Sequence, residues 1–351
     1  MKKVLNNFEK YLYVWVFTCM LIGILFSQYI PGLSVLLNSW QIGNVSIPIG
    51  ICLFLMMYPA LLNFQIKEVK KLIKAPKPIL LTLLSNWIIA PIITVILANI
   101  FLKGYDQLII ALILLGSSPC TAMVIVWGSL AKGNQEQNVI TTSINTLTIM
   151  FLYAPVVVLL TGIQGIPLDV TALLLSVLVF IGLPLIMGHI SKKVLVAKKG
   201  LDWFETTYKP IVGKISILAL LFTLIVLFTL NGDVLLKNPG KMLLVSVPLL
   251  LGFVIIVAIN IFMTKLFKLK YKEAIISVII GSSSHFEIAI ATSITLFGLS
   301  SQAALGTTMG LFWEVPVMLG LVYLGKFLHK KEFWLTTKKH RKAFTSIQNT
   351  N

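Results

Sequence analysis

Charged residues are scarce in this chain. They make up 12% of its 351 residues, whereas a soluble domain carries about 25%. Acidic residues are rarer still, with 12 against 29 lysines and arginines, and the formal net charge is +17. Hydrophobic residues account for 57%, and apolar runs of about 20 residues, long enough to cross a bilayer, recur from end to end. This composition excludes a soluble fold and predicts an all-α polytopic membrane protein.

Cysteine is also rare, and the three cysteines, Cys19, Cys52 and Cys120, fall in separate apolar segments. An odd, scattered set predicts neither a disulfide framework nor a CxxC metal site, and we interpret Cys19 and Cys52 as packing residues. The sequence has no HExxH, no paired intramembrane aspartates, no Gly-Lys-Ser phosphate loop and no repeated filter sequence. These absences disfavour membrane proteases, ATP-driven pumps and selective channels. We expect no catalytic residues and no cofactor.

The distribution of lysines predicts the topology. We place ten spans near 11–30, 43–63, 78–101, 107–130, 139–162, 168–190, 211–231, 243–264, 273–298 and 302–328. Most lysines lie in the even-numbered connections and at the two ends, and the odd-numbered connections hold only Lys103, Lys237 and Lys241. The positive-inside rule then puts both termini in the cytoplasm, which fits an inner (plasma) membrane. Topology explains the lysines without nucleic acid. The first apolar segment lacks a small-residue cleavage site, so we interpret it as a retained helix.

The chain repeats itself. "GSSPCTAMVIVWG" (116–128) matches "GSSSHFEIAIATS" (281–293), and "FLYAPV" (151–156) matches "FWEVPV" (312–317) at a similar offset. We therefore divide the chain into five-helix repeats, residues 1–165 and 166–330, followed by a basic cytoplasmic tail, 331–351. Because five is odd, the second repeat enters the membrane from the opposite side. Inverted repeats of this kind are typical of secondary transporters with a site at the midplane.

The repeated Gly-Ser-Ser motif predicts two broken helices. Ser118 can cap a helix and Pro119 is tolerated in a first turn, whereas proline inside a continuous helix costs a hydrogen bond and causes a clash. We expect the fourth helix to break near Ser118, with its second half beginning at Cys120. Gly281 and the serines after it predict an equivalent break in the ninth helix. Irregular backbone at membrane depth survives only where protein or a water-filled cavity satisfies it, so the two breaks predict a cavity.

Two carboxylates, Glu287 and Glu314, lie well inside the predicted spans. An ionised carboxylate near the membrane centre costs about 2.5–3.5 kcal/mol or more, which makes such residues functional candidates. Burial disfavours the charged form, so Glu287 is expected to take and release a proton or to bind substrate. Glu314 precedes Pro316, and a gating or supporting role for it is as consistent with the sequence as a direct one.

The remaining polar candidates surround the two breaks. Cys120 is expected in the first turn of a half-helix, where the positive dipole end favours a thiolate. His285 can donate to Glu287, bind substrate or cap the helix. The last group is either polar contacts between helices or oxygen ligands for a hard cation; it comprises Asn145, Asn86, Ser118 and Ser283.

Five segments together resemble the arsenite efflux permeases of the bile acid, arsenite and riboflavin transporter superfamily. They are "FLMMYPALL" (54–62), "NWIIAP" (86–91), "SSPCTAMVIVWGSLAKG" (117–133), "HFEIAIATSITLFGLSSQAAL" (285–305) and "EVPVMLGLVYL" (314–324). The resemblance implies ten helices, with crossed, broken fourth and ninth helices, arranged as a core and a panel. It also implies proton-coupled export of arsenite, with antimonite exported by some members.

The resemblance assigns roles to individual residues. The family's functional cysteine falls on Cys120, its glutamate on Glu287 and its fifth-helix asparagine on Asn145. The chain departs from the common family pattern at Ser118-Pro119 and at Ser284-His285. We therefore expect Cys120 to bind trivalent arsenic as substrate, while Asn145, His285 and Glu287 support its hydroxyls and Glu287 carries the proton.

The sequence is also compatible with two other functional hypotheses. A sodium-coupled symporter of an organic anion, as in the bile acid branch, would use the hydroxyl and amide groups near the breaks as sodium ligands. That interpretation predicts that transport does not depend on Cys120. A membrane-embedded enzyme or scaffold would need a second catalytic residue, and none is evident. The sequence does not indicate an oligomeric state.

Overall fold

A computed structural model describes residues 11–42, 45–62, 76–121, 123–237, 239–298 and 301–334. Helices make up nearly all of its regular structure, as predicted, and one small hairpin pairs β1 (Gln41–Ile42) with β2 (Val45–Ser46). The helices of the first half are α2 (Leu12–Tyr29), α3 (Pro31–Ser39), α4 (Ile47–Leu62), α6 (Pro76–Leu84), η2 (Ser85–Ile89), α7 (Ala90–Phe101), α8 (Asp106–Gly116), α9 (Met123–Leu130) and α10 (Gln135–Ile163).

The second half begins with a capped helix. Asp169 accepts a hydrogen bond from the backbone N–H of Ala172, which satisfies one of the free donors at the start of α11. The helices of this half are α11 (Val170–Val177), η3 (Leu178–Gly182), α12 (Leu183–Lys199), α13 (Leu201–Trp203), η4 (Phe204–Tyr208), α14 (Lys209–Lys237), α15 (Pro239–Leu266), α16 (Tyr271–Gly281), α17 (Phe286–Phe297) and α18 (Gln302–Lys330).

Six helical stretches of the described chain are long and apolar enough to cross a membrane. They are Pro76–Phe101, Gln135–Ile163, Val170–Lys199, Leu201–Leu230, Pro239–Leu266 and Gln302–Lys330. The other four predicted spans contain shorter apolar helices, namely Val14–Tyr29, Gly50–Pro59, Asp106–Gly116 and Phe286–Phe297. The chain is thus a multi-pass membrane protein, and the full count of ten spans stays a prediction.

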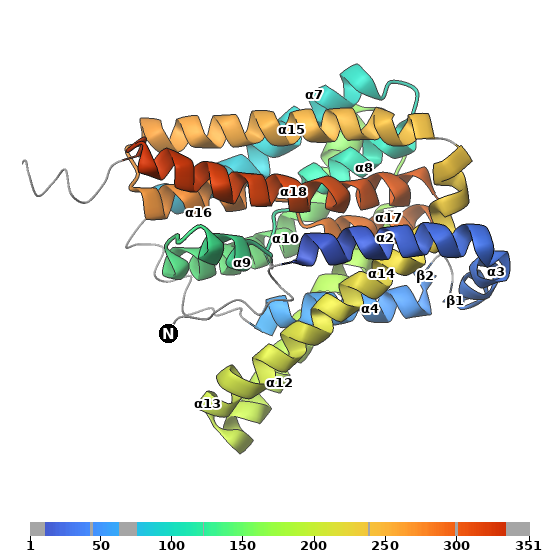
Figure 1. The fold of residues 1–351 in the computed structure, drawn as a ribbon, viewed down its shortest axis with the longest axis horizontal. Helices are drawn as coiled ribbons and strands as arrows, with labels where there is room; N and C mark the ends of the chain where they lie inside the picture. The colour runs from blue at the N-terminus through green and yellow to red at the C-terminus, as the bar shows by residue number, and fades with distance from the viewer. Residues whose placement is uncertain are drawn as a thin grey trace, which may run out of the picture.

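The helices pack in two groups (Figure 1). In one, α14 lies along α2 and α4, and α12 packs on α4. In the other, α15 packs on α7 and α16, and α18 packs on α8 and α17. The groups meet where α4 and α11 contact α17 and where α2 contacts α18. The hairpin of α12, α13 and the start of α14 projects from the bundle.

Two of the predicted helices are interrupted. α8 ends at Gly116 and α9 begins at Met123, while α16 ends at Gly281 and α17 begins at Phe286. The expectation that the second half of the first broken helix begins at Cys120 is wrong. Pro119, directly before Cys120, pairs in a β-bridge, and the helix α9 begins at Met123. Cys120 therefore lies in non-helical backbone, and the first-turn dipole argument for its thiolate does not apply.

Three π-helical segments, η2, η3 and η4, share one cause. Each ends two residues before a proline, namely Pro91, Pro184 and Pro210. A proline has no N–H to donate and its ring clashes with the carbonyl four residues back, and in all three cases that carbonyl lies inside the π segment. The wider turn accommodates the ring, and such bulges recur at functional sites.

Candidate functional site

The two interrupted segments meet. Pro119 and Ser284 form an isolated antiparallel β-bridge, and the backbone N–H of His285 donates to the carbonyl of Ser118 at 2.6 Å. Within a membrane, irregular backbone needs protein or trapped water to satisfy its polar groups. Each break supplies such a partner to the other, and the cysteine and glutamate segments of the sequence come together here.

Cys120 is fully buried at the first break. The side-chain amide of Asn145, on α10, donates to the Cys120 carbonyl oxygen at 3.1 Å. Asn86, in η2, donates in turn to Oδ1 of Asn145 at 3.2 Å. The π turn before Pro91 thus brings Asn86 to α10, and amide groups from two elements hold the backbone that carries the thiol.

Glu287 lies in the first turn of α17 and is buried with its neighbour His285. Its Oε2 is 2.8 Å from Nδ1 of His285, and Nε2 of the same ring is 2.9 Å from Oγ1 of Thr121. Thr121 directly follows Cys120, so contacts lead from the carboxyl group to the cysteine segment. The sequence analysis missed Thr121, and its place beside Cys120 was the one signal for it.

Glu314 lies on α18, beneath the second break, and is also buried. The hydroxyl of Ser283 donates to its Oε1 and that of Ser284 to its Oε2, each at 2.5 Å. Both carboxyl oxygens therefore contact the non-helical segment. A supporting or gating role for Glu314 stays a prediction.

Two further polar residues secure the second break, and the sequence analysis named neither. Ser85, in η2, donates to the carbonyl of Gly281 at 2.7 Å. The amide of Asn260, on α15, donates to the same carbonyl at 3.0 Å and to Oγ of Ser282 at 3.0 Å. The available signal was polarity, because both are hydrogen-bonding residues inside strongly apolar segments. Together they satisfy the carbonyl at the end of α16.

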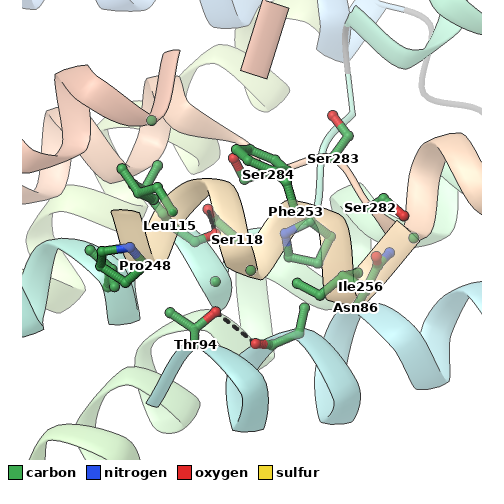
Figure 2. A pocket seen from close by; sticks show the side chains of 18 residues that line it. Asn86, Thr94, Leu115, Ser118, Pro248, Phe253, Ile256, Ser282, Ser283 and Ser284 are labelled. Carbon is green, nitrogen blue, oxygen red and sulfur yellow. Dashed lines mark hydrogen bonds between the residues drawn. The ribbon is translucent and has the colours of Figure 1, made fainter. Parts of the chain in front are cut away.

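A cavity of about 50 Å³ lies against the two breaks (Figure 2). Four of the predicted site residues line it, namely Asn86, Ser118, Pro119 and Ser283. The other five are not among its lining residues; they are Cys120, Asn145, His285, Glu287 and Glu314. The cavity and the cysteine–glutamate contacts are therefore two neighbouring parts of the site.

The other two cysteines belong to a different part of the fold. Cys19 lies in α2 and Cys52 in α4, and both are buried. In the described part of the chain, no three His, Cys, Asp or Glu side chains gather to hold a metal ion. Cys120 is thus the thiol that the fold brings to the breaks.

Long apolar helices around a buried polar site, formed where two interrupted helices meet, define a multi-pass membrane protein of the transporter class. The chain belongs to the sodium bile acid symporter family, whose model matches residues 50–238.

Known relatives extend along nearly the whole chain. An uncharacterized transporter of Synechocystis sp. is 41% identical over 94% of this chain and 90% of its own. The arsenical-resistance protein Acr3 of Alkaliphilus metalliredigens is 36% identical over 95% of both chains. Acr3 of Corynebacterium glutamicum is 30% identical over 93% of this chain and 90% of its own. The family is one of symporters and the Synechocystis relative is a transporter, so the chain is a transporter and not an enzyme.

Proposed function

We propose that this chain is a secondary active transporter that exports arsenite in exchange for protons, with antimonite as a related substrate. The Acr3 relatives, which match along nearly their whole length, support the substrate. The observation that carries the proposal is the contact between the two breaks, which joins the segment of Cys120 to the carboxyl of Glu287 through Thr121 and His285. A soft sulfur and a proton acceptor then share one buried site.

The proposed architecture has two inverted repeats, residues 1–165 and 166–330, with a cytoplasmic tail at 331–351 and both termini in the cytoplasm. The antiparallel sense of the bridge between Pro119 and Ser284 supports it, because equivalent segments of inverted copies run in opposite directions. The group around α14 would act as the panel and the group around α15 and α18 as the core. Rocking of one against the other would open the site to each side in turn.

Cys120 would bind the arsenic atom. Arsenous acid is neutral at pH 7 and trivalent arsenic is thiophilic. An As–S bond forms as one As–O bond breaks, and the thiol proton leaves with the hydroxide as water. A single sulfur releases its cargo more readily than a cage of three thiols would, and transport requires release. Asn145 and His285 would support the remaining hydroxyls.

Glu287 would couple this exchange to protons. A proton arriving from outside protonates the carboxyl, which then no longer supports the arsenic hydroxyls. A water molecule then replaces the sulfur: an As–O bond forms as the As–S bond breaks, a proton from the water returns to the Cys120 sulfur, and arsenous acid leaves. Each state binds either proton or substrate, and this mutual exclusion produces exchange. Glu314, Ser283, Ser118 and Pro119 would keep the two breaks in register, and Asn86 would do the same through Asn145.

Everted membrane vesicles test the proposal. With an acidic interior, we expect wild-type vesicles to accumulate arsenite and Glu287→Gln vesicles to fall to background, because the amide cannot carry a proton. Glu332→Gln, at an exposed position after α18, is the matched control. Absence of arsenite uptake by the wild type would refute the substrate, and proton-driven uptake by Glu287→Gln would reassign the proton carrier.

A second candidate is sodium-coupled symport of an organic anion. The description of the matching family favours it, and the hydroxyls of Ser282 and Ser283 offer oxygen atoms of the kind that sodium binds. This candidate predicts uptake of an organic anion that follows a sodium gradient and is unchanged in Cys120→Ser.

A further inference from the structure

The cavity beside the breaks is lined by residues of two kinds (Figure 2). Some are polar, among them the serines of the break segments and Thr94 of α7. Others are apolar, among them Leu249, Phe253 and Ile256 of α15. None of the described residues that line the cavity carries a charge. This lining suits a small neutral solute with several hydroxyl groups better than an organic anion.

The polar lining residues retain hydrogen-bonding capacity. The hydroxyls of Ser283 and Ser284 donate hydrogen bonds to Glu314. The hydroxyl of Ser118 donates to the carbonyl of Leu115. A hydroxyl oxygen has two lone pairs, so all three oxygens can still accept hydrogen bonds from a guest. A solute that donates several O–H groups is therefore the complementary ligand.

The size of the cavity narrows the ligand further. A water molecule needs about 10–15 Å³ of such space, so about 50 Å³ admits roughly three to five water-sized groups. Arsenous acid consists of one arsenic atom and three hydroxyl oxygens, which falls inside that range.

We propose that this cavity is a thiol-independent subsite that holds neutral arsenous acid by hydrogen bonds, before or after its exchange with Cys120. The proposal rests on the proposed arsenite function and adds a second binding site for arsenite besides Cys120. The subsite is linked to the cysteine segment and to the residue that supports the second break. Asn86 lines it and bonds to Asn145, which holds the cysteine carbonyl, and Ser283 lines it and bonds to Glu314.

Equilibrium dialysis of the purified full-length protein against arsenite, with bound arsenic counted by elemental mass spectrometry, separates the two binding sites. Cys120→Ser is expected to retain weak, reversible arsenite binding. Adding Ile256→Phe should put a larger side chain into the space that the solute would occupy and lower that binding about tenfold, the change that 1.4 kcal/mol makes. Ile255→Phe is the matched control, because Ile255 is 37% exposed on the same helix whereas Ile256 is 7% exposed. Ser118→Ala removes one hydrogen-bonding oxygen without adding bulk and is expected to weaken binding in the same direction.

Loss of all arsenite binding in Cys120→Ser would overturn the subsite. Equal arsenite binding in the Ile256→Phe and Ile255→Phe variants would overturn it as well. So would an amount of bound arsenic that depends on the sodium concentration and not on the arsenite concentration. Parallel uptake by wild-type vesicles separates the two claims. Wild-type transport without cavity-dependent binding refutes the subsite alone, whereas absence of wild-type transport refutes the arsenite function itself.

Discussion

Thr121 and His285 form the side-chain contact that spans the two breaks. When a neutral His285 donates from Nδ1 to Glu287, its Nε2 accepts from the Thr121 hydroxyl. When the imidazole is protonated, both nitrogens donate and the Thr121 hydroxyl must turn to donate elsewhere. A proton that passes onto the imidazole therefore changes a hydrogen bond on the residue next to Cys120.

Thr121→Val tests this contact. Valine keeps the shape of threonine and removes the hydroxyl, which leaves a buried ring nitrogen without its partner and costs about 1–3 kcal/mol. We expect arsenite uptake into everted vesicles to fall about tenfold, since 1.4 kcal/mol is a tenfold change. Thr295→Val is the control, because its hydroxyl bonds within α17 to the carbonyl of Ala291. Equal uptake by the two variants would remove Thr121 from the mechanism.

At the scale of single residues, the sequence predicted which residues belong to the site but not which side chains they would hydrogen-bond to. Cys120 and Glu287 stood out because a thiol and a carboxyl are rare in apolar segments and fall in matching motifs. The contact of Thr121 with His285 joins residues 164 positions apart, and no local pattern encodes which neighbour a ring nitrogen meets. Asn260 and Ser85 were missed for the same reason, because their role depends on the packing of α15 and η2 against the second break.

Among the elements, η2 has the largest effect on the site. Its π turn places Ser85 on the carbonyl of Gly281 and Asn86 on Asn145. One distorted turn therefore contacts the second break directly and the first break through Asn145. The breaks were readable from Gly-Ser-Ser and Pro119, because proline and a serine cap favour a helix start. The π turns were not predicted, although the position of Pro91 contains their cause.

Pro91→Ala is expected to let η2 relax toward a regular α-helix. The side chains of Ser85 and Asn86 would then rotate away from the breaks, and displacement of this kind can reduce activity by roughly 10–100-fold. Arsenite uptake should fall while the thermal unfolding temperature in detergent is retained. Pro210→Ala, which changes the equivalent turn η4 in the projecting hairpin, is the control. Uptake that is equally unaffected in both variants would show that the distortion at η2 has no functional role.

For the whole molecule, the account requires the two halves of the chain to touch through their breaks. The bridge between Pro119 and Ser284 predicts a Cα separation of about 4.5–5.5 Å, and disulfides form over about 4.4–6.8 Å. In a background without the three natural cysteines, Pro119→Cys with Ser284→Cys should therefore cross-link on oxidation. After cleavage at a protease site inserted near residue 166, the halves should stay joined on a non-reducing gel. Either cysteine alone is the control, and halves that separate would contradict the fold.

The central claim is that one particular thiol, Cys120, binds arsenic during transport. The most direct measurement is arsenite uptake into everted vesicles by Cys120→Ser and by the double variant Cys19→Ser with Cys52→Ser, at equal amounts of folded protein. The account predicts background uptake for the first and nearly wild-type uptake for the second. Wild-type uptake by Cys120→Ser would contradict it.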